Sequence, residues 1–439
     1  MTPRTPVVVI GSSPWHSQWR RRQHLYSHLA RFREVYHLDP PFPVLDFWRR
    51  VAPRHARAAG GEIDRGCPDG GHAREWSCPP PRAGISLGVW RRSAGRVELD
   101  SSGVRVVRGC PGFPAERYSP EARRMNAWLQ RRQVHALLAH WRKSGLVTHP
   151  ILVCYDALLH PLEPQADWAQ LVFDVVDDYP ARTSFHRFGR MLAEKTHALA
   201  SASDLVIVTS DALRARLASS AASDRVGGIG RSHACRLGDR VKLLPHGVDP
   251  ARFHPDAWMG TAFETWKRTP GPKAVFHGTL DHKIDLETLR ALLRAGVTLL
   301  LAGEMSWSTD TLAQLRTLGG AHYFGSLPLA DAAALVAAGD VGILPYLPFA
   351  GHEGATILKH LEFLAAGLPV VGSDLPACRR CGEGIKVARD PESFAASVKA
   401  AFHEANDSAF SIARNRRIEI ARENSWEARA AELDRWLAP

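Results

Sequence analysis

The sequence lacks any apolar run long enough to cross a bilayer, which excludes membrane-spanning helices. Its first residues, MTPRTPVVVIG, turn polar too soon for the apolar stretch of a secretory signal peptide. The 439 residues are typical of a globular protein in their apolar content, so disorder is not expected. These features predict a protein that is made in the cytoplasm and stays there.

Cysteine is scarce, and seven is an odd number, which favours free thiols over a disulfide framework. Cys378 and Cys381 have the spacing of a metal-binding pair, and Cys67, His72 and Cys78 form a loose second group. A zinc site would require the two groups to meet in space. Isolated thiols are the simpler interpretation, and we predict no bound metal.

The charge is unbalanced, since 56 basic and 45 acidic side chains give a net charge of +11. A basic surface could meet nucleic acid, anionic lipid or a polyanionic acceptor. Nucleic acid is the least favoured, because the arginines are not interleaved with aromatic residues. Arg20–Arg22 and Arg49–Arg57 could hold the protein peripherally at the inner membrane face, although a solvated face is the commoner meaning of such charge. Pro53–Arg96 reads as a long exposed excursion rich in glycine, proline and arginine.

Short buried strands alternate with helices along most of the chain, which predicts doubly wound α/β sheets. The length allows two or three domains. Met125–Trp141 is a predicted helix with Trp128 on its inner side. The strands are expected at Val7–Ile10, Val35–Leu38, Val104–Val107, Ile151–Tyr155, Leu171–Val176, Leu205–Thr209, Ala274–Phe276, Val297–Leu301 and Val341–Leu344.

Carboxylates and a histidine follow two successive strands, at the sheet edge where ligands gather in such folds. Asp156 and His160 follow one strand, and Asp177 and Asp178 follow the next. An aspartate there could accept a proton from an acceptor hydroxyl. The alternative, which we favour for Asp178, is that it caps the following helix.

A glycine-bearing loop, a helix and a buried strand are predicted over Gly351–Asp374, with Thr356 as the N-cap. Lys359 and Glu362 lie three residues apart on the polar face of this helix. Free N–H groups at its start can bind an anion, lysine can contact a phosphate oxygen, and glutamate can accept hydrogen bonds from ribose hydroxyls. The segment suits a nucleoside diphosphate, and an ordinary amphipathic helix is the alternative.

The string Lys-x-x-Glu-Phe-Leu-Ala-Ala-Gly-Leu-Pro-Val-Val from Lys359 onward resembles the nucleotide-sugar helix of GT-B glycosyltransferases of the group 1/family 4 type. The resemblance covers most of the chain and is strongest over Phe173–Phe253 and Phe276–Asp374. Two departures stand out. Glu353 lies one residue earlier than the first glutamate of many relatives, and His246 replaces their usual asparagine.

The resemblance implies GT-B architecture, with two doubly wound Rossmann-like domains facing a central cleft and a C-terminal helix crossing back to the first domain. The expected units are an acceptor-side domain over 1–245, a nucleotide-sugar domain over 246–410, and the returning helix over 411–439. The insertion over about 53–96 has no counterpart in the resemblance.

The resemblance also implies the positions of two binding regions. The nucleotide-sugar site would comprise Gly278, Lys283, Glu304, Gly325, Gly354, Ala355, Thr356, Lys359 and Glu362. The acceptor side of the cleft would comprise Gly11, Ser12, Trp19, Arg20, His246 and Gly247.

The sequence contains no Asp-x-Asp triplet, the motif that commonly holds a divalent cation for this reaction. We therefore predict transfer from a UDP- or GDP-sugar to a hydroxyl acceptor without a metal or any cofactor, with Lys283, Lys359 and the helix N-terminus stabilising the leaving diphosphate. Retention is usual for family 4, whereas inversion would need a base such as Asp156, Asp177 or His160. A nucleotide-sugar 2-epimerase of the same fold and a non-catalytic partner protein are the alternatives, and the sequence leaves sugar, nucleotide and acceptor open.

Overall fold

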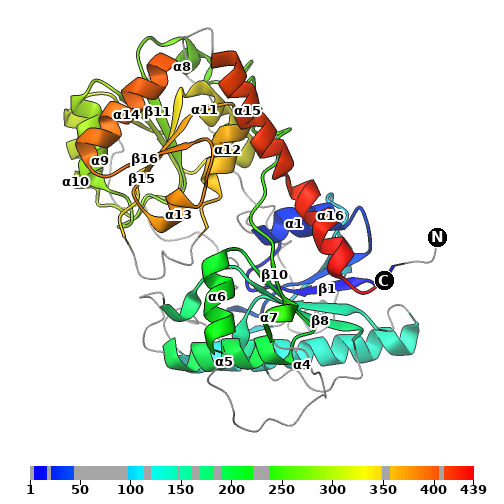
Figure 1. Ribbon diagram of the computed structural model, residues 1–439. Coiled ribbons are helices and arrows are strands. Elements are labelled where there is room, and N and C mark those ends of the chain that lie inside the picture. Colours follow the sequence, from blue (N-terminus) through cyan, green and yellow to red (C-terminus); the bar gives the residue numbers. More distant parts are fainter. Residues whose placement is uncertain are drawn as a thin grey trace, which may run out of the picture.

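In the computed structural model, most of the chain forms two sheets of largely parallel strands, and helices pack against each sheet (Figure 1). The described residues are 4–16, 21–43, 97–109, 111–112, 120–145, 149–160, 168–181, 189–220, 237–348, 356–404 and 410–439. The predicted excursion at 53–96 lies outside these ranges.

The first sheet has eight strands in the order β10-β9-β8-β7-β1-β2-β5-β4. All neighbours are parallel except β4, which pairs antiparallel with β5. The bounds are β1 Val7–Ile10, β2 Val35–Leu38, β4 Val97–Leu99, β5 Arg105–Val107, β7 Ile151–Cys154, β8 Gln170–Val175, β9 Leu205–Val208 and β10 Val241–Leu243. The central strands are buried throughout because helices cover both faces of the sheet.

Helices lie on both sides of this sheet (Figure 1). One face is covered by α4, α5 and α6, and the other by α1 together with the C-terminal helix α16. The bounds are α1 Arg21–Leu29, α4 Pro120–Ser144, α5 Gly189–Ala202, α6 Asp211–Ser220, α7 Leu237–Arg240 and α16 Trp426–Trp436. Two 3-10 turns, η1 Ala157–Leu159 and η2 Tyr179–Ala181, follow β7 and β8, and a short pair joins β3 Phe42–Pro43 to β6 Pro111–Gly112.

The second sheet has six parallel strands in the order β13-β12-β11-β14-β15-β16. Its strands are β11 Lys273–His277, β12 Thr298–Ala302, β13 Ala321–Tyr323, β14 Val341–Leu344, β15 Val370–Ser373 and β16 Ile385–Ala388. Its helices are α8 Glu264–Arg268, α9 Leu286–Arg294, α10 Thr309–Thr317, α11 Leu329–Ala338, α12 Lys359–Ala365, α13 Pro376–Arg379, α14 Pro391–Glu404 and α15 Phe410–Glu423. The strand order reverses between β11 and β14, so this sheet is doubly wound as predicted.

The chain passes between the two sheets twice, and the two passages are hydrogen-bonded to each other. Val248, on the outward passage, donates from its N–H to the Asn424 carbonyl at 3.0 Å and accepts from the Trp426 N–H at 2.9 Å. On the return, α15 packs against α12 of the second sheet and α16 packs against α1 of the first (Figure 1). The predicted crossing back to the first domain is therefore made by α16.

Two sequence expectations about side-chain placement are wrong. Trp128 is 41% exposed on the outer side of α4, where the Arg132 guanidinium covers its ring, so it is not a core residue. Arg21 and Arg22 are buried, so neither can contact an anionic membrane. Arg20 and the segment Arg49–Arg57 lie outside the described residues.

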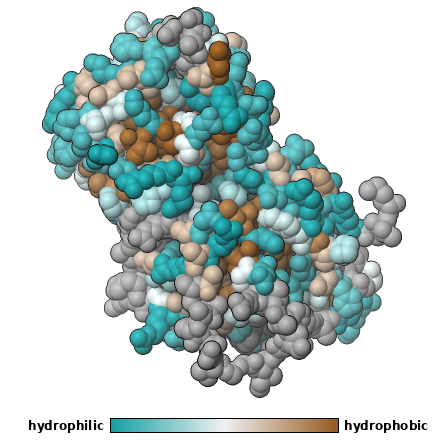
Figure 2. Space-filling model, viewed as in Figure 1, coloured by the Kyte–Doolittle hydropathy of each residue, from teal (hydrophilic) through white to brown (hydrophobic). Residues whose placement is uncertain are grey.

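Figure 2 shows hydrophilic side chains over most of this face of both domains, with apolar side chains gathered in smaller patches. Within the described ranges, none of the helices combines the length and the apolar character that a bilayer crossing requires.

Candidate functional site

The carboxyl ends of β11 and β14 mark the point where the strand order of the second sheet reverses, which is where ligands bind in open α/β sheets. β11 ends at His277 and is followed by Gly278, with φ at 151°. The loop after β11 is tied to the end of β14, because the Leu347 N–H donates to the Lys283 carbonyl at 2.7 Å. Helix α12 begins beside this point.

An imidazole, an ammonium group and a carboxylate meet there. Nε2 of His277 lies 2.8 Å from Oε2 of Glu362, and Nζ of Lys359 lies 3.2 Å from the same oxygen. Nζ of Lys359 is also 3.4 Å from Nδ1 of His277. The side chains of His277 and Glu362 are each 6% exposed, whereas that of Lys359 is 26% exposed. Lysine is thus the member of this cluster that reaches solvent.

The electrostatics of the cluster favour an ionised glutamate beside a neutral histidine. Burial opposes ionisation of Glu362, but Lys359 and His277 outweigh it and hold the pKa of the carboxyl well below its usual range. Burial, reinforced by the Lys359 charge, lowers the pKa of His277. Glu362 was predicted on the polar face of its helix. That face is buried rather than solvated, because it packs against the end of β11.

Three glycines, Gly278, Gly303 and Gly325, lie at the ends of the neighbouring strands β11, β12 and β13. The Gly278 N–H donates to the Ala302 carbonyl at 2.9 Å, and the Gly303 N–H donates to the Gly325 carbonyl at 2.7 Å. A Cβ on Gly303 would lie 1.9 Å from the Gly278 carbonyl oxygen, so only glycine fits. The Glu304 carbonyl accepts from the Leu280 N–H at 2.8 Å. Gly278, Glu304 and Gly325 therefore come together, through backbone groups.

Lys283 lies on the loop after β11, as expected for a phosphate-binding lysine. Its Nζ is 3.3 Å from Oδ2 of Asp281, and its side chain is 25% exposed. The lysine is therefore paired in the loop, as Lys359 is paired in the helix.

Thr356, just before α12 of the second domain, is hydrogen-bonded to a residue of the first domain. Its Oγ1 lies 3.1 Å from Oγ1 of Thr209, which in turn donates to the Val176 carbonyl at 3.0 Å. The predicted N-cap role is wrong, because α12 begins at Lys359 and Thr356 uses its hydroxyl across the interface. Gly354 and Ala355 lie outside the described residues.

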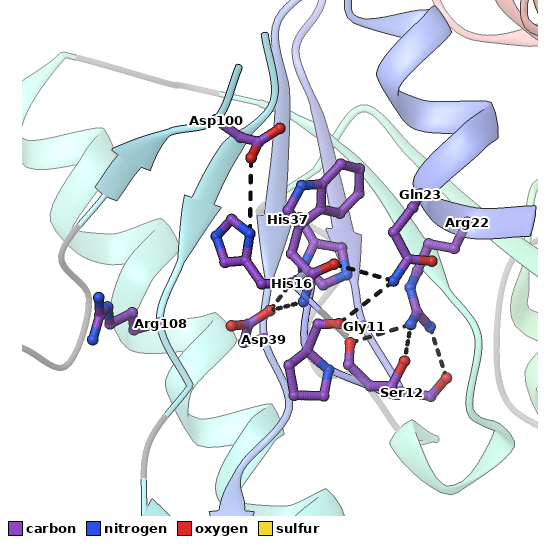
Figure 3. Close-up of polar contacts among 12 residues, drawn as sticks. Gly11, Ser12, His16, Arg22, Gln23, His37, Asp39, Asp100 and Arg108 are labelled. Carbon is purple, nitrogen blue, oxygen red and sulfur yellow. Dashed lines mark hydrogen bonds and ion pairs between the residues drawn. The ribbon is translucent and has the colours of Figure 1, made fainter. Parts of the chain in front are cut away.

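On the acceptor side, Gly11 directly follows β1 and lies against the buried His37 (Figure 3). A Cβ at Gly11 would lie 2.5 Å from the His37 ring, so glycine is required there. Nη1 of Arg22 donates to Oγ of Ser12 at 2.9 Å, and Nδ1 of His37 lies 3.1 Å from Oδ1 of Asp39. Gly11 and Ser12 thus belong to a polar network at the end of β1. Trp19 and Arg20 lie outside the described residues.

The four predicted acid–base residues are held by local contacts in the first domain. Asp156 caps η1 by accepting from the Leu158 N–H at 2.9 Å, and it pairs with Arg123 at 3.2 Å. The His160 carbonyl accepts from Nζ of Lys195, and burial lowers the pKa of the His160 imidazole.

Asp177 and Asp178 follow β8. Oδ1 of Asp177 accepts from the Asp178 N–H at 2.9 Å, and Oδ1 of Asp178 accepts from the Ala181 N–H at 3.3 Å. Asp178 also pairs with Arg216. These bonds fit the capping interpretation of Asp178. Asp177 lies next to Val176, at the point where Thr209 and Thr356 join the two domains.

His246 and Gly247 lie on the outward passage between the domains, against Trp426 of α16. The His246 ring meets the Trp426 ring edge-on at 6.3 Å. Burial, with Arg21 as the next cause, lowers the pKa of His246 to about 3. These two residues line the junction between the domains.

Sequence reasoning did not single out His277, Thr209 or His24. His24 stacks on Trp426 with ring centres 5.4 Å apart, and burial lowers its pKa to about 4. The one available signal was the position of His277, directly before Gly278 at a strand end. In the part of the chain that the structure describes, no group of three or more His, Cys, Asp or Glu side chains is arranged to hold a metal ion.

These features define a fold class: two Rossmann-like domains, with a polar cluster at the strand ends of the second, form the GT-B fold. Residues 271–404 match the family model "Glycosyl transferases group 1". The chain therefore carries a group 1 glycosyltransferase domain, and the resemblance noted in its sequence is confirmed.

Solved structures show the same architecture over the whole chain. A sucrose-phosphate synthase from Thermosynechococcus elongatus is 16% identical with a TM-score of 0.64, and the match covers 99% of this chain and 98% of that one. The HepE protein of Anabaena in complex with UDP is 13% identical with a TM-score of 0.62, covering 98% of each chain. A UDP-forming α,α-trehalose-phosphate synthase from Burkholderia xenovorans, in complex with glucose-6-phosphate, is 14% identical with a TM-score of 0.61, covering 98% of this chain and 99% of that one. No curated protein sequence matches the chain.

Proposed function

We propose that this protein transfers a sugar from a UDP- or GDP-sugar to a hydroxyl acceptor, without a metal. The observation that carries the proposal is the cluster of Lys359, Glu362 and His277 at the switch point of the second sheet. A carboxylate held ionised beside a solvent-reaching ammonium offers a hydrogen-bond acceptor for a ribose and a charge for a phosphate.

The leaving diphosphate gains negative charge as the glycosidic bond breaks, and that charge needs stabilisation. Lys359 and Lys283 are the cations that we assign to this role. Each is paired with a carboxylate in the free protein, Lys359 with Glu362 and Lys283 with Asp281. Diphosphate would therefore compete with these carboxylates for the two ammonium groups.

The acceptor would enter from the first domain. The Thr209–Thr356 contact places the ends of β8 and β9 opposite the start of α12, so an acceptor held near Asp177 would face the donor. The solved UDP complex and glucose-6-phosphate complex of the same fold support a nucleotide donor and a hydroxyl acceptor. The cytoplasmic location and any membrane contact stay predictions from the sequence.

Calorimetric titration with UDP, GDP and dTDP in the presence of EDTA tests the donor site. We expect one nucleotide to bind in the micromolar range and the chelator to have no effect. Glu362→Ala should abolish this binding, while Glu392→Ala, on the surface of α14, should leave it unchanged.

Failure of all three nucleotides to bind wild-type protein would overturn the proposal. Binding that disappears with EDTA would overturn only its metal-independent part. Binding that is equal in Glu362→Ala would move the nucleotide to another site.

A further inference from the structure

His277 is a buried histidine for which the donor site, as proposed above, has no assigned role. It is fixed from two sides by aromatic rings. Phe253, from the passage between the domains, and Phe363, from α12, each lie with ring centres 5.8 Å from the imidazole. His277 as a whole is only 5% exposed, so its imidazole ring cannot turn freely.

Each ring nitrogen of His277 faces a different charge. Nδ1 lies toward the Lys359 ammonium and Nε2 toward the Glu362 carboxylate, at 3.4 and 2.8 Å. Because an ammonium can only donate and an ionised carboxylate can only accept, these distances fit an imidazole that accepts at Nδ1 and carries its proton on Nε2. This is a neutral imidazole in a single tautomer. The approach of Nε2 to Oε2 is close but is not aligned as a hydrogen bond, which leaves both atoms without a hydrogen-bond partner among the described residues.

The second oxygen of the carboxylate remains available. Among the described residues, every contact of the Glu362 carboxylate is made through Oε2, with His277 and Lys359. Oε1 is therefore left to accept from a ligand hydroxyl. A carboxylate with one oxygen anchored and one open has a fixed orientation, as a side chain that discriminates hydroxyl positions needs.

We propose that His277 is a positioning residue for the nucleotide-sugar donor: its Nε2–H, 2.8 Å from Oε2 of Glu362, donates to that oxygen when the donor binds, and its Nδ1 holds the Lys359 ammonium beside the phosphate site. The inference rests on the proposed function, because it assigns a role within that donor site. It makes His277 a determinant of donor affinity, which acts through Glu362 and Lys359 rather than by touching the sugar.

Two substitutions separate this role from simple packing. His277→Phe keeps an aromatic ring between Phe253 and Phe363 but removes both nitrogens. His277→Gln keeps an N–H group at about the reach of Nε2 and can still donate to Glu362. His322→Phe is the matched control, since His322 is half-buried on β13 and packs against Trp266.

The measurement is the dissociation constant of the nucleotide that the wild-type protein binds. It is determined for each variant at several pH values between pH 8 and pH 6. We expect His277→Phe to weaken binding about tenfold or more, which is the effect of losing a hydrogen bond to a charged group. His277→Gln should stay within about threefold of wild type, and His322→Phe should not differ from it. In turnover with a nucleotide sugar, the loss should fall on the donor KM more than on kcat.

The pH series adds a readout that packing alone would not move. Without a donor at position 277 the Glu362 carboxyl is easier to protonate, so binding by His277→Phe should weaken toward pH 6 more steeply than binding by wild type. The charged groups that face this site are Lys359 and Glu362, and the other titratable groups coupled to Glu362 are His24, His246, His360 and Tyr346. Burial lowers the pKa of those three histidines and raises the pKa of the tyrosine, so none of the four changes charge between pH 8 and pH 6. All of these groups are present in both proteins, so the difference reports on His277.

Equal affinities of wild type and His277→Phe would overturn the inference while leaving the donor site intact. Equal loss in the phenylalanine and glutamine variants would also overturn it, because packing would then be the requirement. If His277→Phe fails to fold, His277→Asn replaces it, since the shorter amide cannot reach Glu362 and should bind as weakly. Absence of nucleotide binding to wild type would instead count against the proposed function itself.

Discussion

Trp426 packs directly onto the backbone of Gly247. A Cβ at position 247 would lie 2.9 Å from two carbons of the Trp426 indole ring and 2.9 Å from the Trp426 backbone nitrogen. These distances are shorter than van der Waals contact allows. The junction between the domains is therefore built around the missing side chain of one glycine.

Gly247→Ala should destabilise the protein by about 1–3 kcal/mol, because the methyl group must displace Trp426 or the passage that carries position 247. Denaturant unfolding gives the free energy of unfolding of the variant. Gly238→Ala is the control, since no described residue outside the helix itself lies within 4 Å of a Cβ there. Position 238 lies in helix α7, so alanine should be neutral or slightly stabilising. Equal stability of wild type and Gly247→Ala would contradict the packing argument.

Lys359→Gln should lower kcat about a hundredfold if Lys359 stabilises the departing diphosphate, since one charged group at such a position is worth that much. The assay is release of nucleoside diphosphate from the donor that calorimetry identifies. Lys386→Gln, at an exposed position on β16, provides a matched control in the same domain. A kcat that is unchanged in Lys359→Gln would remove this lysine from the leaving-group role.

Asp174→Leu should cost roughly 3–5 kcal/mol, because it leaves the buried Arg21 charge without its partner. Nε of Arg21 lies 3.4 Å from Oδ2 of Asp174, with both side chains at most 3% exposed, and the Tyr155 hydroxyl donates to the same oxygen at 2.7 Å. The double variant Arg21→Met/Asp174→Leu should recover part of the loss, since no charge is then buried alone. Chemical unfolding of the four proteins of this cycle measures the effect. A double variant that loses the sum of the two single losses would argue against coupling.

Stability should fall in mild acid because of three histidines at the domain junction. Burial lowers the pKa of His24 to about 4, of His246 to about 3 and of His360 to about 4, from an ordinary value of 6.5. Below about pH 6.5 the unfolded chain binds protons that the folded protein does not, so the free energy of unfolding decreases as pH falls from 6.5 toward 4.

His246→Asn tests this pH dependence. The free energy of unfolding of the variant should fall less steeply between pH 6 and pH 5 than that of wild type, by about 1.4 kcal/mol per pH unit, because one proton fewer is taken up on unfolding. The exposed His403→Asn should keep the wild-type slope. Parallel slopes for wild type and His246→Asn would show that His246 is not buried neutral.

The fold could be predicted from the sequence because its signals are local. Val7–Ile10 and Val341–Leu344 were expected with the bounds that the structure has, since a buried strand is visible as a short apolar run in the residues themselves. Trp128 was misplaced because apolar character alone does not say which face of α4 is covered.

The site was harder to predict, because its contacts join residues that are distant in the sequence. Lys359 and Glu362 could be found from their spacing, but His277 meets them only because β11 and α12 are neighbours in space. Thr356 was read as a helix cap from its local context, whereas its hydroxyl contacts Thr209 in the other domain. No local pattern carries that information.

The bonds from Val248 to Asn424 and Trp426 bind the two passages between the domains into a single strap. Two tethers at separate points would resist rotation, whereas tethers joined at one point leave an axis about which the domains can swing. We expect any opening of the protein to bend at this strap and to separate Thr209 from Thr356, which lie in different domains. The same motion would carry Lys359, Glu362 and His277 away from the first domain as one unit, so the donor site could remain assembled while the acceptor side is exposed.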